Sequence, residues 1–215
     1  EFFDRAERVL GTRPVLLSGA DEGRLAYAGA RSALVRPVDG SVLVVDIGGG
    51  CTEFVLGAEA PMDSAGVDVG CVRMTERHLH DDPPTAEQVA AAWADIEAAV
   101  AAAGRQVPFA EAGCLVGLAG SVTTVAAMAM DLPEYDASIL HGSVISADQV
   151  SVATARLLAM SRAERAALPY MHPGRVDVIA GGAMVLDAIV AAGGFPSVVV
   201  SETDILDGIV YSLGR

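Results

Sequence analysis

Residues 42–57, which read VLVVDIGGGCTEFVLG, constrain the fold of this chain more than any other stretch. Two apolar runs flank three glycines, so the stretch predicts two strands joined by a tight turn. The plainest interpretation is a β-hairpin whose glycines only make the turn. However, Asp46 lies near the end of the first run, and a carboxylate there needs a partner, often a metal ion with its waters.

The glycines support a functional interpretation as well. Gly48, Gly49 and Gly50 let a phosphate approach the backbone N–H groups, because no Cβ stands in the way. Thr52 adds a hydroxyl, and Glu53 points to the opposite face of the return strand, since side chains alternate along a strand. The stretch therefore predicts a phosphate-binding loop with a metal-directing acid on one side and a second acid on the other.

A second motif is SGADEGRL, at residues 18–25. Taken alone, it favours an N-capped helix with a solvated acidic first turn. The functional interpretation makes Glu22 a base that polarises a water, with Arg24 pairing to an acid or to a phosphate.

Two further segments are candidates for anion binding. In LAGSVTT, residues 118–124, a strand runs through a glycine turn into a helix, so the helix N-terminus at Gly120 and Ser121 can hold an anion. A simple capped helix is an equally good interpretation. Arg73, in GCVRMTER, can reach a phosphate, although such arginines are more often solvated or paired with a neighbouring acid.

Strands followed by alternating strands and helices predict an α/β domain with a mixed sheet. Thr85, Ser146 and Ser161 are expected to cap helices. A strand at VDVIA is the alternative to one helix over 173–192. Strands are expected at 14–18, 41–47, 52–57, 65–69, 115–119 and 197–201; helices are expected at 2–10, 21–34, 70–80, 85–104, 121–130, 146–160, 161–168 and 173–192, with a last helix capped by Thr203 or Asp204.

Composition excludes several classes of function. The chain has 14 basic residues, all arginine, against 28 acidic ones, a net charge of −14, which argues against a nucleic-acid or acidic-membrane surface. With 52% hydrophobic residues the chain can bury a sizeable core. Three cysteines without CxxC spacing favour a reduced, cytoplasmic protein. The uncharged run 114–130 is short and lacks basic flanks, so we expect buried core and no membrane span.

Together these segments resemble the exopolyphosphatase / guanosine pentaphosphate phosphohydrolase family of the actin-like ATPase superfamily, in its actinobacterial form. The resemblance covers nearly all 215 residues. It rests on a series of motifs in family order, namely SGADEGRLAYAGA, VLVVDIGGGCTEFVLG, VGCVRMTERHL, GLAGSVTTVAAMAMDLPEYD, LHGS, PGRVDVIAGGAM and SETDILDGIVYSL.

The resemblance implies an actin-like (ribonuclease H-like) α/β domain with a mixed, five-stranded-type sheet flanked by helices. Residues 1–215 match the family's C-terminal domain, and the N-terminal domain with the first phosphate loop has no counterpart here. The chain does not begin with Met and reads like the middle of a longer gene product. The expected partners are that missing domain and the phosphate substrate; a homodimer is compatible with the resemblance, and no nucleic acid or membrane is expected.

The resemblance also implies site residues. Glu22 matches the proposed catalytic glutamate that activates water, Asp46 and Gly48 match the second phosphate loop, and Glu53 matches a second acid that helps to place water or Mg²⁺. Cys51 stands where the family usually has Ser, and a thiol is a weaker donor than a hydroxyl. The phosphate-binding residues are expected to be Gly48, Gly49, Gly50, Cys51, Thr52, Arg73, Gly120 and Ser121.

The family implies Mg²⁺-dependent cleavage of the terminal phosphoanhydride of inorganic polyphosphate. Removal of the 5′-phosphate of guanosine pentaphosphate is a close alternative, which these motifs do not separate. A non-catalytic phosphate- or nucleotide-sensing paralogue is the alternative from another class: the retained acids Glu22 and Glu53 favour the enzyme, and Cys51 mildly favours the sensor. A sugar- or acetate-kinase-like ATPase ranks third, since it needs different acids and a nucleotide pocket.

Overall fold

The hairpin expected around the three glycines forms, and it builds the centre of the sheet. A computed structural model of the protein describes residues 1–31, 34 and 40–214. In it β1 (Ser41–Ile47) and β2 (Thr52–Gly57) pair antiparallel, which sets Asp46 directly opposite Glu53. The two acids therefore lie side by side where β1 ends.

The remaining strands extend this hairpin into a mixed sheet. β3 (Pro61–Val67) adds antiparallel to β2, and β4 (Ala112–Leu118) adds parallel to β1. β6 (Ser197–Val200) lies parallel to β4, and β5 (Val144–Ser146) closes that edge antiparallel to β6. The order β3-β2-β1-β4-β6-β5 gives a mixed sheet of six strands in the described residues, one more than the five-stranded type that the resemblance implied.

The missed strand is β5, which has only three residues. It is too short to show an alternating pattern, and its partner β6 lies about fifty residues further along the chain. Its pairing is a tertiary contact, and local sequence does not encode it.

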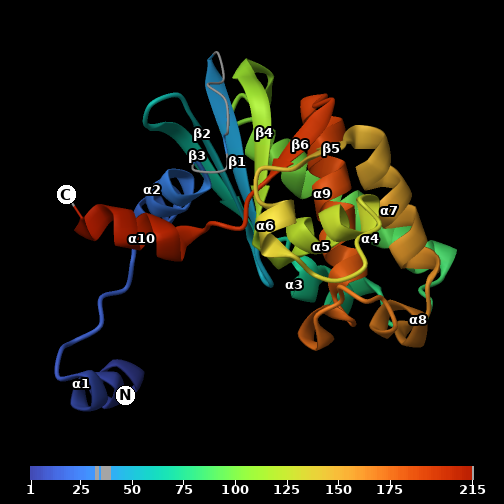
Figure 1. Cartoon of the computed structure of the whole chain (residues 1–215), viewed down its shortest axis with the longest axis horizontal. Helices are drawn as coiled ribbons and strands as arrows, with labels where there is room; N and C mark the ends of the chain where they lie inside the picture. The colour runs from blue at the N-terminus through green and yellow to red at the C-terminus, as the bar shows by residue number, and fades with distance from the viewer. Residues whose placement is uncertain (32–33, 35–39, 215) are drawn as a thin grey trace.

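Helices cover both faces of the sheet (Figure 1). Leu43, Val45 and Phe54 pack into the larger core, under α3, α4, α5, α7 and α9. Val44 and Val55 face the smaller core, which α2 and α10 cover. The helices are α1 (Phe2–Leu10), α2 (Gly19–Ala30), α3 (Cys71–His78), α4 (Ala86–Gly104), α5 (Ala119–Ala129), α6 (Ala137–Leu140), α7 (Ala147–Ala159), α8 (Arg162–Ala166), α9 (Ile179–Gly193) and α10 (Ile205–Leu213), with 3₁₀ turns η2 (Phe109–Glu111) and η3 (Pro173–Arg175).

The helix starts follow the capping residues that the sequence predicts. Thr85, Ser146 and Ser161 each accept from the backbone three residues on and form complete capping boxes with α4, α7 and α8. Asp204 and not Thr203 caps α10. Ser18 caps α2, which ends at Ala30 and not at residue 34; residues 32–33 lie outside the described part of the chain.

The strand expected at 14–18 is wrong. All five residues are described, and none of them pairs with a strand. Val15 and Leu16 are 84% and 81% exposed, so the apolar pattern that suggested a strand has no sheet to join. Figure 1 shows this segment as an extended connection to α1, which lies apart from the rest of the molecule.

The single helix expected over 173–192 is also wrong, as is its alternative, a strand at VDVIA. η3 and a turn precede α9, which begins only at Ile179. The carbonyl of Val176 accepts from the side chain of Arg165 at 3.0 Å, so it is engaged outside a helical ladder. Other predicted elements exist with shifted ends: β3 starts earlier than 65, β4 starts at Ala112, and α3 is shorter than 70–80.

The uncharged run 114–130 forms most of β4 and all of α5, both largely buried, as expected. Across the described ranges, no helix combines the length and the apolar character that crossing a bilayer demands.

Candidate active site

The carboxyl end of β1 runs into the glycine loop, which packs against α3. The carbonyl of Gly48 accepts from the N–H of Cys71 at 3.0 Å, and the carbonyl of Gly49 accepts from the next two N–H groups at 2.9 and 3.0 Å. Because C=O and N–H of a trans peptide point in opposite directions, the N–H groups of Gly49 and Gly50 point away from α3. In the described part of the chain neither donates to a backbone carbonyl, so both can meet a ligand.

Close contacts hold this loop in place. A Cβ on Gly70 would lie 2.7 Å from the carbonyl carbon and oxygen of Gly49, so only glycine fits there. Arg73 supports the loop from α3: its Nε donates to the carbonyl of Gly50 at 2.7 Å, and its guanidinium lies 3.4 Å from the carboxylate of Asp68. The structure thus places Arg73 beside the loop as a brace.

Thr52 lies at the loop but faces the core. Its side chain is fully buried, and its hydroxyl donates to the carbonyl of Val69 at 2.7 Å. The hydroxyl is therefore turned away from the open side of the loop, where a phosphate would approach.

Four carboxylates gather on the α2–α10 side of the β1 end. Burial, together with the negative charges of Glu53, Asp204 and Glu22, raises the pKa of Asp46 to about 6. The causes all favour the neutral acid, so negative charge at this point is poorly compensated by the protein itself. A carboxylate in such surroundings is suited to binding a cation.

Glu53 and Cys51 form a pair at the same place. Burial and the charge of Glu22 raise the pKa of Glu53, while a hydrogen bond from the Cys51 thiol acts to lower it. In return the carboxylate raises the pKa of Cys51 to about 12. The exposed thiol is therefore protonated at neutral pH and is not an activated nucleophile.

Glu22 reaches this group from the first turn of α2. Ser18 caps the helix, and Gly23 lets α2 approach the sheet, since a Cβ there would lie 3.0 Å from Val55. Glu22 is exposed, so its carboxylate is open to water. Arg24 lies 3.5 Å from Asp21, which is the acid-pairing role expected of it.

Asp204 is a member of the acid group that sequence reasoning did not assign to the site. It caps α10, where its carboxylate accepts from the N–H of Leu206 at 2.7 Å. Only its capping role was visible in the sequence. Its position near Asp46 depends on α10 crossing α2, which is a tertiary contact.

On the other side of the β1 end lies a cavity of about 240 Å³. It brings together two predicted phosphate-binding segments that are about seventy residues apart in the chain. Ser121 is buried at its edge, packed against Gly182 of α9. Ala119 has φ of 70° where β4 turns into α5, a conformation that costs energy outside glycine and is often found at functional sites. The cavity is lined by Gly48, Gly49, Cys71, Gly120, Ser121 and Arg175, among others.

Arg175 is the cation of this cavity, and the sequence reasoning missed it. Its guanidinium lies directly over Gly120, where any Cβ would overlap it. It donates to the Thr124 hydroxyl at 3.1 Å and sits 5.9 Å from the ring of Tyr135. Among the described residues no carboxylate lies within ion-pair distance of it. A half-buried, unpaired guanidinium beside free amides is suited to an anion.

Comparison with known proteins gives this arrangement a family. The model of the Ppx/GppA phosphatase family matches residues 1–214. The chain belongs to the Ppx/GppA phosphatase family. It is 42% identical over 207 residues to "Exopolyphosphatase 2" of Mycobacterium tuberculosis, covering 94% of this chain and 65% of that relative. It is 28% identical to "Guanosine-5'-triphosphate,3'-diphosphate pyrophosphatase" of Aeromonas salmonicida, covering 99% of this chain and 41% of that relative.

Solved structures agree on the fold. An exopolyphosphatase-like protein superposes with a TM-score of 0.93 at 39% identity, over 100% of this chain and 72% of that one. The Aquifex aeolicus PPX-GPPA enzyme superposes with a TM-score of 0.87 at 27% identity, over 98% of this chain and 69% of that one. The fold is therefore the actin-like one of Ppx/GppA proteins, as predicted, and this chain spans about 65% of the length of its curated exopolyphosphatase relative.

Within this Ppx/GppA chain the predicted site residues form two groups at the end of β1. Glu22, Asp46, Glu53 and Cys51 lie on the acid side. The glycine loop and the Gly120–Ser121 turn lie on the cavity side. Their assigned roles stay predictions.

Proposed function

We propose that the protein containing this chain removes the terminal phosphate of inorganic polyphosphate. The observation that carries the proposal is the arrangement at the end of β1, where a cavity lined by the glycine loop and Arg175 adjoins a group of carboxylates. Phosphoryl transfer to water needs few covalent partners: it needs a positioned phosphate, neutralised charge and an oriented water. The two sides of this site are suited to those three tasks.

On the cavity side, amides of the glycine loop and the Arg175 guanidinium would bind phosphate oxygens. On the acid side, exposed Glu22 would accept a proton from the attacking water, a task for which a water-accessible carboxylate is suited. This division of tasks is supported by the positions of the charged groups, since Arg175 lies on the cavity side and the four carboxylates lie on the acid side.

Mg²⁺ is the cofactor that we propose. The described residues contain no set of three His, Cys, Asp or Glu side chains placed to hold a metal ion unaided. Asp46 and Glu53 nevertheless suit Mg²⁺, which usually takes one or two carboxylates and completes its shell with water and substrate phosphate. When bound, the ion would neutralise charge on the phosphate.

Guanosine pentaphosphate is the second candidate substrate. The Aeromonas salmonicida relative, whose name describes cleavage of that nucleotide, supports it at 28% identity. The higher identity of 42% to the Mycobacterium tuberculosis relative favours polyphosphate. Since this chain spans 65% of that relative, we also propose that a further domain supplies the opposite wall of the site.

The test is phosphate release by the complete protein with Mg²⁺, from long-chain polyphosphate and from guanosine pentaphosphate side by side. We expect faster release from polyphosphate. Preference for guanosine pentaphosphate would select the second candidate. Binding of either compound without release would contradict the enzyme and support a phosphate or nucleotide sensor.

A further inference from the structure

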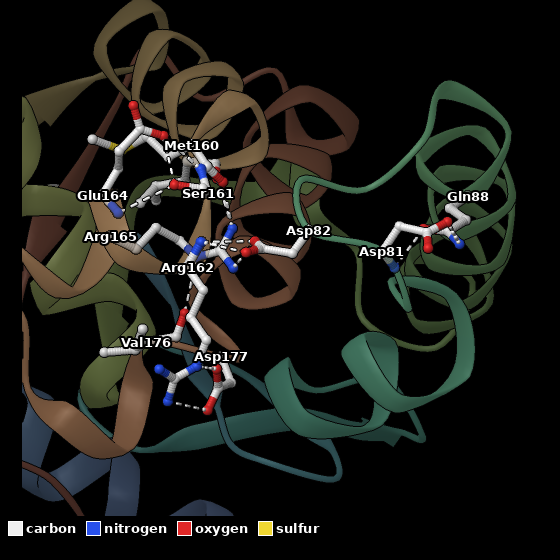
Figure 2. Close-up of polar contacts among 11 residues, drawn as sticks. Asp81, Asp82, Gln88, Met160, Ser161, Arg162, Glu164, Arg165, Val176 and Asp177 are labelled. Carbon is white, nitrogen blue, oxygen red and sulfur yellow. Dashed lines mark hydrogen bonds and ion pairs between the residues drawn. The ribbon is translucent and has the colours of Figure 1, made fainter.

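A buried arginine lies behind the cavity, away from the proposed phosphate. The Arg165 side chain, whose contacts Figure 2 shows, is only 7% exposed. Its Nε donates to the carbonyl of Val176 at 3.0 Å, and one terminal nitrogen donates to the carbonyls of Met160 at 2.8 Å and Leu157 at 3.4 Å. Its other terminal nitrogen lies 3.2 Å from the carboxylate of Asp82. One guanidinium thus ties together three chain segments.

Asp82 and Arg162 strengthen the same junction. The Asp82 carboxylate accepts from the backbone N–H of Arg162 at 2.7 and 2.9 Å, at the start of α8. The Arg162 side chain in turn donates to Asp177 at 2.5 Å, as Figure 2 shows. Two consecutive residues, Val176 and Asp177, are therefore both held by arginines of α8.

Stability alone is a weak reason for a buried charge at this place. Removing a guanidinium from water is costly, and a well-packed apolar side chain is often as stabilising as a buried ion pair. The ion pair fixes the positions of its partners, because a planar guanidinium holds each acceptor that it binds in a defined direction. The contacts of Arg165 therefore point to control of position.

One segment that Arg165 contacts adjoins the cavity directly, and a second is connected to the cavity through α3. Val176 directly follows Arg175, the cavity's unpaired cation, and precedes α9. Asp82 lies in the turn after α3, and the first residue of α3, Cys71, also lines the cavity. The contact of Arg165 with both segments sets one segment relative to the other.

We propose that Arg165 and Asp82 form a positioning pair that holds Arg175 over the cavity, so that the affinity of the site for phosphate depends on the pair. The proposal rests on the proposed function only in taking the cavity as the phosphate site. Arg165 itself contacts no substrate and acts through Arg175.

A double-mutant cycle tests this mechanism on the complete protein. Binding of tripolyphosphate is measured by calorimetry, and KM and kcat for polyphosphate are measured in parallel. Arg165→Met should weaken tripolyphosphate binding and raise KM by about tenfold, the usual size of coupling within a contact network. Arg175→Met should weaken binding as well. The double variant should bind tripolyphosphate less than about twofold more weakly than Arg175→Met alone. Arg165 acts through the Arg175 side chain, and that side chain is already lost.

Two further variants complete the design. Asp82→Asn keeps the shape of the half-exposed partner and should weaken binding in the same direction, so it serves if Arg165→Met does not fold. Arg77→Met, which breaks the ion pair to Asp95 on α4, is the matched control and should bind as wild type does.

The outcomes separate the two proposals. Wild-type binding in Arg165→Met or, if that variant does not fold, in Asp82→Asn would overturn the positioning role, as would effects that multiply in the double variant. Tripolyphosphate binding without turnover would contradict the proposed function. The double-mutant cycle would then still test the positioning role of Arg165 and Asp82. Absence of binding in the wild type would overturn both.

Discussion

Asp46 is a carboxylic acid whose ionised form is disfavoured both by burial and by neighbouring negative charges. Its pKa in the folded protein is about 6, against an ordinary 3.8. Above pH 6 the folded state therefore carries a charge that its surroundings disfavour. As the pH falls below 3.8 the side chain becomes neutral in both the folded and the unfolded states, and the cost disappears.

Asp46→Asn should therefore stabilise the chain at high pH only. We expect the free energy of unfolding to rise by up to about 3 kcal/mol at pH 8 and hardly at all at pH 3.5. Urea unfolding at the two pH values, without Mg²⁺, measures the difference. Asp63→Asn, on the exposed face of β3, is the control. An equal gain at both pH values would mean that charge is not the cause.

Cys51 offers a second prediction from a single side chain. Its thiol donates to Glu53, and a hydroxyl is a stronger donor. Cys51→Ser should stabilise the ionised carboxylate and lower the pKa of Glu53. The acidic limb of the pH–rate profile should then move to lower pH, by less than about one unit. Cys114→Ser, in β4, controls for the substitution itself, and a shift to higher pH would refute the assignment.

Among the elements, the crossing of α2 and α10 positions the acid group. Gly29 and Gly208 allow it: a Cβ on Gly29 would overlap the carbonyl of Asp204, and one on Gly208 would overlap the carbonyl of Leu25. These helices carry Glu22 and Asp204 respectively. Their separation therefore sets where two of the four acids lie.

Gly208→Ala should force the two helices apart. Inside a helix this change normally stabilises, but here we expect a loss of about 1–3 kcal/mol from overpacking. Urea unfolding measures it, and the rate of phosphate release should fall with the displaced acids. Gly19→Ala, at a position with open space, should leave stability unchanged or higher. Stabilisation by Gly208→Ala would show that the crossing is not tight.

Elements with local signals were predictable, and those that depend on distant contacts were not. The strands around the glycine loop were predictable from their apolar runs. The starts of α4, α7 and α8 were predictable from the capping residues Thr85, Ser146 and Ser161. The apolar run at 14–18 looks like a strand but finds no partner. The helix expected to begin at residue 173 begins later, after η3 and a turn, and in that turn the carbonyl of Val176 accepts a hydrogen bond from Arg165.

The site shows the same division. The sequence motifs located Glu22, Asp46 and Glu53, which the structure brings together. Arg175 and Asp204 were missed, because their places depend on contacts of η3 and α10 with segments that are distant in the sequence.

At the scale of the whole molecule, the net charge and the length of the chain both bear on whether residues 1–215 alone can be active. A net charge of −14 repels a polyanion, and Glu22 of the acid group is exposed to water. We therefore expect residues 1–215 alone to bind phosphate weakly and to hydrolyse polyphosphate negligibly. Activity should require the further domain that the longer relatives suggest, because a closed cleft would exclude water. Comparing turnover by the isolated chain and by the complete protein checks this, and robust turnover by the chain alone would contradict it.

The central claim is that Glu22 activates water against a phosphate bound at the end of β1. The most direct measurement is polyphosphate turnover by the complete protein carrying Glu22→Gln, with Mg²⁺ and saturating substrate. We predict a kcat about 100-fold or more below wild type, the usual effect of losing a general base. Because Glu22 is exposed, the fold and the binding of tripolyphosphate should be retained. A turnover close to that of the wild type would contradict the claim.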